Sequence, residues 1–179
     1  ESIRRFALED AKFLVQRGVK AIVVACNTAT AHALPMLREN FDLPVIGVIE
    51  AGVESALNDP AAGRIGIIAT RATLAAQIFD LTLVRLGYTV VLPNESLMDR
   101  LVLPGIDMVK AGEPLRGGQL IEQAVQTLLN NGARAVILAC TETPLALDAT
   151  ESQLRSHCVD TTEALARCCV AWWQSRQAP

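Results

Sequence analysis

The sequence lacks the features that mark several large classes of protein. Only two of its 179 residues are histidine and no Cys-x-x-Cys pair occurs, so no metal site is expected. No Gly-rich dinucleotide motif is present either, and we expect no cofactor. No apolar run approaches the roughly 20 residues that cross a bilayer. A net charge of −3 gives no electrostatic reason to expect nucleic acid, so neither a membrane nor a nucleic acid is predicted as a partner.

Aromatic residues are also scarce, at 4% of the chain, whereas hydrophobic residues make up 51%. The core is therefore expected to be aliphatic. Five cysteines follow no regular spacing, and Cys168 and Cys169 are adjacent. This usage indicates reduced thiols in a cytoplasmic protein rather than a disulfide framework.

Aliphatic runs alternate with helical patterns along the chain. Strands are expected at 21–25, 44–49, 64–69, 88–92 and 135–139. Helices are expected at about 3–15, 28–40, a short one through 53–57, then 72–86, 97–110 (interrupted by Pro104-Gly105), 115–130 and 161–173, with Gly18, Gly87 and Gly132 as C-caps. The alternation favours an α/β fold whose parallel sheets carry helices on both faces. The run 21–25 is typical of a strand buried on both faces, and "NDPAAG" at 58–63 of a linker.

Two aliphatic strands end in similar polar motifs. Cys26-Asn27-Thr28 follows the first strand, and Cys140-Thr141-Glu142 follows the last one. The surrounding segments, "GVKAIVVACNTATAHAL" and "GARAVILACTETPLAL", align with a one-residue gap. The repeat suggests two similar α/β halves that each present the same loop.

This pattern is suited to proton transfer. Ligands of parallel α/β sheets lie outside the carboxyl ends of the strands, and helix-terminal N–H groups favour a thiolate and can hold a carboxylate. One thiol can take the proton next to a carboxylate while the other delivers a proton to the opposite face, which inverts the stereocentre. Either cysteine alone is more often a buried small hydrophobe, and Asn27 or Thr28 alone more often caps a helix. The duplicated context favours the chemical interpretation, whereas His32, His157 and Cys158 lack such a context.

These motifs identify a resemblance to the aspartate/glutamate racemase superfamily, whose members use two cysteines and no cofactor. The likeness runs from about Ser2 to Trp173, and "ACNTATAHALPMLRENFDLPVIGVIEAGV" resembles the glutamate racemase pattern. The turn in "RIGIIATRAT" implies substrate contact by Thr70 or Thr73. "ACTETPL" is similar to the second motif, but Glu142 stands where glutamate racemases usually have His. That Glu, and the stretch "IDMVKAG", are typical of aspartate racemases and broad-specificity members.

The resemblance implies a fold and a division of the chain. The expected fold is two similar α/β domains related by a pseudo-twofold, with the active site in the cleft between them and a homodimer as the assembly. Residues 1–59 would be part of the first domain, 60–157 the second domain, and 158–179 a C-terminal helix that returns to the first. The family pattern places a strand with a Gly-rich loop and a further substrate loop before the segment that opens here. We therefore expect about 45 N-terminal residues to be missing.

The resemblance also implies an activity and roles for the site residues. The chain is expected to be a racemase that needs no pyridoxal phosphate (PLP) and acts on aspartate, glutamate or both. Cys26 and Cys140 would be the acid/base pair. Asn27, Thr28 and Thr141 would hold the substrate carboxylate and amino group, and Glu142 would orient Cys140 or contact the ammonium.

Two alternatives remain open at this point. The first is an isomerase or decarboxylase of a dicarboxylate with the same fold, which needs only one cysteine as nucleophile or proton donor. The second is a ligand-binding α/β protein without catalytic activity. The presence of both motif cysteines counts against the single-thiol enzyme, and exchange of the substrate α-hydrogen with deuterated solvent separates a racemase from a binder.

Overall fold

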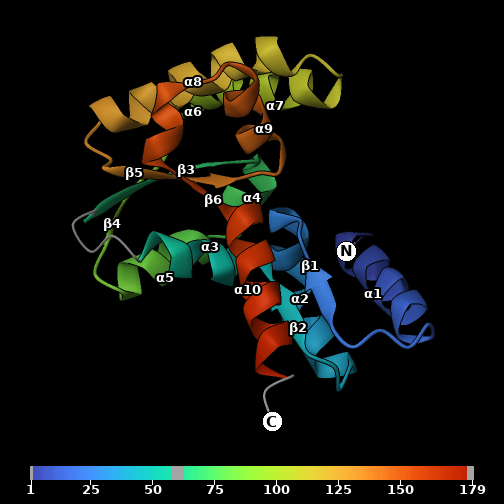
Figure 1. Cartoon of the computed structure of the whole chain (residues 1–179). Helices are drawn as coiled ribbons and strands as arrows, with labels where there is room; N and C mark the ends of the chain where they lie inside the picture. The colour runs from blue at the N-terminus through green and yellow to red at the C-terminus, as the bar shows by residue number, and fades with distance from the viewer. Residues whose placement is uncertain (1, 58–62, 177–179) are drawn as a thin grey trace.

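The computed structural model describes residues 2–57 and 63–176 and contains two parallel sheets (Figure 1). In the smaller sheet, β1 (Ile22–Val24) pairs with β2 (Val45–Gly47). The larger sheet has the order β4-β3-β5-β6. Its strands are β3 (Arg64–Ala69), β4 (Thr89–Val91), β5 (Ala135–Ala139) and β6 (Cys158–Asp160), and each pairing is parallel. The predicted α/β class with parallel sheets is confirmed, whereas the pseudo-twofold relation of two domains stays a prediction.

Helices join successive strands and cover the larger sheet on both faces. They are α1 (Ser2–Val15), α2 (Asn27–Asn40), α3 (Val48–Ala56), α4 (Arg71–Ala75), α5 (Ile78–Arg85), α6 (Glu95–Leu97), α7 (Leu103–Lys110), α8 (Pro114–Asn130), α9 (Glu142–Ala149) and α10 (Thr161–Ser175), with a π-helical turn η2 (Met98–Val102) and a 3-10 turn η3 (Gln153–His157). Helices α7, α8 and α9 lie on one face, and α3 and α5 on the other (Figure 1). None of the helices in the described ranges is long and apolar enough to span a membrane.

The core follows the alternation of side chains along β3 and β5. Ile65 and Ile67 of β3 pack with α3, α5 and α10, whereas Ile68 packs with η2, α7 and α8. On β5, Ile137 and Leu138 divide between the same two clusters. Since successive strand residues point to opposite faces, a strand covered on both sides is apolar throughout, and this is the pattern of β3 from Ile65 to Ala69 and of β5.

Several predicted boundaries are confirmed and others are wrong. Gly18, Gly87 and Gly132 end helices with φ of +75°, +87° and +93°, as expected of C-caps. The predicted helix 72–86 is two helices, α4 and α5, because Gln77 adopts a left-handed φ of +54° between them. The stretch 97–110 is helical without interruption, since the π-turn η2 precedes Pro104 at the start of α7, where proline is tolerated.

Strand predictions failed in two places. The run 21–25 was expected to be buried on both faces, but Val23 is 46% exposed, because β1 is covered on one side only. No strand was expected at 158–160, just before the predicted helix 161–173, but these residues form β6. A strand of three residues is too short to produce a periodic pattern.

The expected domain boundary between 59 and 60, within the expected linker, lies outside the described residues. Helix α10 packs beside α3 (Figure 1). Its predicted membership of the first domain remains a prediction.

Helix α9, which begins at Glu142, crosses α8 at a glycine. A Cβ on Gly118 would lie 2.3 Å from the carbonyl oxygen of Ala146, a main-chain atom that cannot rotate away. Gly118→Ala should therefore destabilise the fold by about 2 kcal/mol despite the better helix propensity of alanine. Chemical denaturation measures this loss. The exposed neighbour Gln119 provides the control, because Gln119→Ala should be neutral or stabilising; an equal result for both variants would show that α8 and α9 do not pack this closely.

Candidate active site

The two cysteine motifs follow parallel strands of different sheets, β1 of the smaller sheet and β5 of the larger one. In the larger sheet Ala69 of β3 is the register partner of Ala139 of β5. Thr70 and Cys140, the next residues of each strand, therefore leave the sheet side by side at its carboxyl edge. Cys26 follows the end of β1 by two residues. This edge is where parallel α/β sheets bind ligands.

Cys26 caps the first helix after β1. Its extended backbone (φ −87°, ψ 123°) precedes α2, and its Sγ accepts a hydrogen bond of 3.5 Å from the main-chain N–H of Ala29. The side chain is exposed, and an apolar groove of about 340 Å³ between α1 and β1, lined by residues that include Phe6 and Val23, reaches it. The sulfur therefore lies at the positive end of α2.

Three threonine hydroxyls connect the first motif to the end of β3. Thr28 Oγ1 lies 3.1 Å from Thr70 Oγ1 and 2.9 Å from Thr73 Oγ1, and the latter two are 3.1 Å apart. Thr28 and Thr70 are half-buried, whereas Thr73 is only 3% exposed. Thr70 also caps α4 by accepting the N–H of Thr73. The structure thus brings Thr28 together with Thr70 and Thr73, which lie 42 and 45 positions further along the chain.

Asn27 connects the first motif to β5. Its Nδ2 donates to Thr161 Oγ1 at 3.3 Å, and Thr161 in turn donates to the main-chain oxygen of Leu138 at 2.9 Å. Asn27 is 3% exposed, and its Oδ1 is buried without a hydrogen-bond partner among the described residues. Thr161 was missed in the sequence analysis, because a residue that begins a C-terminal helix gives no local sign of a contact 134 positions away.

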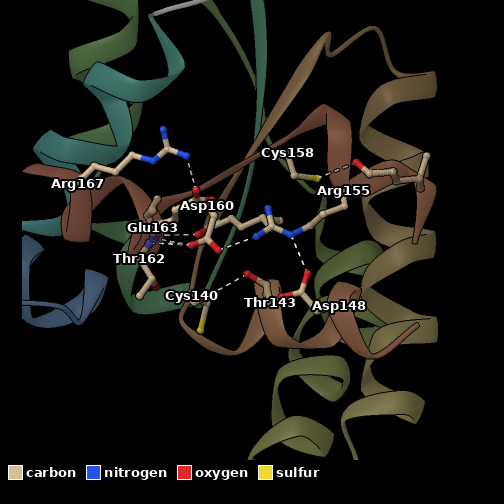
Figure 2. A network of polar contacts seen from close by, with 12 residues as sticks. Cys140, Thr143, Asp148, Arg155, Cys158, Asp160, Thr162, Glu163 and Arg167 are labelled. Carbon is tan, nitrogen blue, oxygen red and sulfur yellow. Dashed lines mark hydrogen bonds and ion pairs between the residues drawn. The ribbon is translucent and has the colours of Figure 1, made fainter. Parts of the chain in front are cut away.

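Cys140 lies in a different environment from Cys26. It is 8% exposed, and its Sγ donates to Glu142 Oε2 at 2.9 Å. Thr141 Oγ1 donates to the same oxygen at 3.1 Å. The main-chain oxygen of Cys140 accepts from Thr143 Oγ1 at 2.8 Å (Figure 2). Glu142 therefore lies beside the second thiol, as expected.

This environment keeps the second thiol protonated. Burial raises the pKa of Cys140 to about 12, and the hydrogen bond to Glu142 and its negative charge add to the rise. The main-chain N–H of Glu142 and the ammonium of Lys110 act in the opposite direction. Burial also raises the pKa of Glu142, but hydrogen bonds from Cys140 and Thr141 and the charge of Lys110 outweigh it, and the pKa is lowered. The resting pair is a thiol beside a carboxylate.

Lys110 is a further residue near this pair. It ends α7 and acts electrostatically on both Cys140 and Glu142. Its stretch "IDMVKAG" resembles a segment of aspartate racemases, but no role of Lys110 in the site was predicted from it. Among the described residues, no group of three His, Cys, Asp or Glu side chains is arranged to hold a metal ion.

The remaining cysteines stand apart from both motifs. Cys158 Sγ donates to Leu154 O at 3.3 Å, and burial raises its pKa to about 12. Cys168 and Cys169 pack against the core of α3, β3 and α10. None of these three cysteines was expected to take part in the chemistry, and that expectation stays a prediction.

The charge of Glu142 should control the reactivity of Cys140. At pH 8 a thiol with a pKa of about 12 is ionised in only about one molecule in ten thousand, so alkylation should be slow and should accelerate with rising pH. Glu142→Gln removes an acceptor and a negative charge, lowers the pKa of Cys140, and should raise its iodoacetamide rate at least about tenfold. Peptide mass spectrometry measures the rate. Cys158 is the internal control, because its pKa is raised by burial without Glu142; equal acceleration of both thiols would indicate loosening of the fold instead.

Known proteins resemble this chain over most of its length. A family model described as Asp/Glu/Hydantoin racemase matches residues 3–169. A glutamate racemase from Persephonella marina is 38% identical over 149 residues, which cover 83% of this chain and 56% of that protein. One from Limosilactobacillus fermentum is 35% identical over 144 residues, covering 79% and 52%. The chain spans about half the length of the curated relatives that it matches.

Solved racemase structures share the fold. A glutamate racemase from Bacillus anthracis superposes with a TM-score of 0.75 at 28% identity, over 98% of this chain and 66% of that one. A glutamate racemase from Francisella tularensis in complex with D-glutamate gives 0.76 at 26% identity, over 98% and 65%. An aspartate racemase from Picrophilus torridus gives 0.77 at 23% identity, over 96% and 70%, and shares the fold. Together with the family model, these matches show that the chain belongs to the Asp/Glu/hydantoin racemase family.

Proposed function

We propose that this chain carries the catalytic residues of a PLP-independent racemase that interconverts the L- and D-forms of an acidic amino acid, aspartate or glutamate or both. The observation that supports this most directly is the pair of cysteines in complementary environments. Cys26 is exposed at the positive end of α2, whereas Cys140 is buried and donates to Glu142. Family membership and the D-glutamate bound to a relative agree with this substrate class.

In the proposed reaction the two sulfurs work on opposite faces of the α-carbon. The thiolate of Cys26 takes the α-proton, and the thiol of Cys140 gives its proton to the other face, so that the configuration inverts. In the reverse direction the roles are exchanged. Cys140 is suited to begin as the donor because burial and Glu142 keep it protonated at neutral pH.

The substrate would be held by the polar groups around these sulfurs. Thr28, Thr70 and Thr141 supply hydroxyls, and Asn27 Oδ1 is a buried acceptor available to an ammonium group. The hydroxyl of Thr73 already contacts those of Thr28 and Thr70, and we assign it the support of these two residues. The positive charge of Lys110 suits a substrate with a second carboxylate.

The assembly implied by the family stays part of the proposal, because the chain covers only 52–56% of the first two curated relatives. We propose a cleft between two α/β domains as the active site, a homodimer as the assembly and the cytoplasm as the location. An isomerase or decarboxylase with one essential thiol is the second candidate. The distinct contacts of both cysteines favour the two-thiol reaction.

The two-thiol mechanism predicts that neither cysteine is dispensable. Cys26→Ser and Cys140→Ser should each reduce racemisation of L- and D-glutamate and aspartate by at least about a thousandfold, because serine is a far weaker acid and base. Circular dichroism of the product mixture and incorporation of solvent deuterium at the α-carbon measure the loss. Cys158→Ser should keep its activity. Full racemisation by either motif variant would rule out the mechanism, and one essential cysteine without inversion would favour the decarboxylase or isomerase.

Glu142 should affect the two directions of racemisation differently. Cys140 gives a proton in one direction and takes it in the other, and the charge of Glu142 acts oppositely on these roles. In Glu142→Gln we expect kcat to fall about tenfold in one direction and less in the other. Because the enantiomers have equal free energy, kcat/KM must be the same for both enantiomers in every variant. The ratio of the two KM values therefore equals the ratio of the two kcat values. Unchanged kcat values in both directions would leave Glu142 only the role of an acidic residue at the start of α9.

A further inference from the structure

Thr161 is a buried residue at the point where three elements meet, and no step of the proposed reaction uses it. It is the first residue of α10 and is 0% exposed. Its hydroxyl contacts Asn27 of the first motif and Leu138 of β5. A Cβ placed on Gly52 of α3 would come within 2.6 Å of its methyl group. The residue therefore touches both the segment that carries Cys26 and the strand that leads to Cys140.

The hydrogen bonds of Thr161 have a fixed direction. A hydroxyl has one proton, and here it points at the main-chain oxygen of Leu138 at 2.9 Å. Thr161 Oγ1 can then only accept from Asn27, so the Nδ2 end of that amide must face it. The Oδ1 end is thereby turned away from Thr161, and it has no partner among the described residues although it is buried. The two hydrogen bonds from Asn27 to Thr161 and from Thr161 to Leu138 form a relay. This relay decides which end of the Asn27 amide is available as an acceptor.

A polar network holds Asp160, the residue before Thr161 (Figure 2). Asp160 caps α10 by accepting the N–H groups of Thr162 and Glu163 at 2.8 and 3.1 Å. Arg155 joins Asp160 to Asp148 of α9 with distances of 2.7 and 3.0 Å. Because α9 begins at Glu142, the network connects the helix after Cys140 with the residue that holds Asn27.

We infer that Thr161 is a positioning residue for the reaction: its hydroxyl orients the Asn27 amide and fixes the Cys26 motif against the strand that ends at Cys140. The expected effect of Thr161 on racemisation rests on the proposed function, whereas its effect on the orientation of Asn27 does not. A loss of this bond leaves Asn27 free to turn, and a turned amide presents a donor where an ammonium group needs an acceptor. Misplacement of about 1 Å at such a site costs up to about a hundredfold in rate.

The test separates the hydroxyl of Thr161 from its methyl group. Thr161→Val keeps the shape and removes the hydroxyl, and it should lower kcat/KM for racemisation about 10- to 100-fold. Thr161→Ser keeps the hydroxyl and should retain kcat/KM within about threefold even where it lowers the melting temperature. If Thr161→Val does not fold, Thr161→Cys replaces it, since a thiol is a much weaker hydrogen-bonding group. A valine or cysteine variant as active as the serine variant would overturn the inference.

Thr30→Val is the matched control for stability. Thr30 is also buried, at 2% exposure, and its hydroxyl also donates to a strand carbonyl, that of Val24. It receives no hydrogen bond from Asn27. We expect a similar fall in melting temperature with kcat/KM within about threefold of wild type. An equal loss of activity in Thr30→Val and Thr161→Val would show that Thr161 contributes only to the stability of the fold, and it would contradict the inference.

A double variant distinguishes failure of this inference from failure of the proposed function. If Thr161 acts through Asn27, then Thr161→Val should reduce kcat/KM no further in an Asn27→Ala background. If the wild-type protein exchanges no α-proton, the proposed function fails. The relay is then judged by NMR, in which the side-chain amide signals of Asn27 should shift in Thr161→Val but not in Thr30→Val. Unchanged Asn27 amide signals in Thr161→Val would show that Thr161 does not orient Asn27, and this result would overturn the inference independently of activity.

Discussion

The pairing of β3 with β5 is the constraint on which the candidate site depends. Both strands are largely aliphatic and are covered on both faces. A slip in register by one residue would turn every side chain of the strand toward the opposite face and so into the other core cluster. The observed register aligns Ala69 with Ala139, and the residues that follow, Thr70 and Cys140, are consequently neighbours. Aliphatic packing far from the polar groups thus fixes the place where the polar groups meet.

The duplicated motif has produced two thiols with different properties. Both cysteines follow an aliphatic strand and precede a helix, yet Cys26 is exposed at its helix cap and Cys140 is buried beside a carboxylate. The third position of each motif accounts for part of the difference, because Thr28 joins a cluster of hydroxyls whereas Glu142 contacts the sulfur. Such an asymmetry suits a reaction that needs one base and one acid at the same time.

Local patterns in the sequence predicted the parts of this arrangement that depend on local physics. Aliphatic runs located β3 and β5, glycines located the helix ends at Gly18 and Gly87, and the strand ends located both cysteines. The role of Thr161 could not be predicted, since it depends on a contact between residues 134 positions apart. The pKa of Cys140 was also only partly predictable, because its largest cause is burial, which depends on the packing of distant helices.

The described strands of the two sheets differ in how they are covered. The larger sheet has four strands with core on both faces, whereas β1 and β2 pair over three residues each and leave Val23 46% exposed. The start of α2 is fixed by two contacts to residues that directly follow strands of the larger sheet, namely Thr28 to Thr70 and Asn27 to Thr161. In this arrangement the polar groups proposed to bind substrate also hold the first thiol in place, so binding and positioning share the same residues.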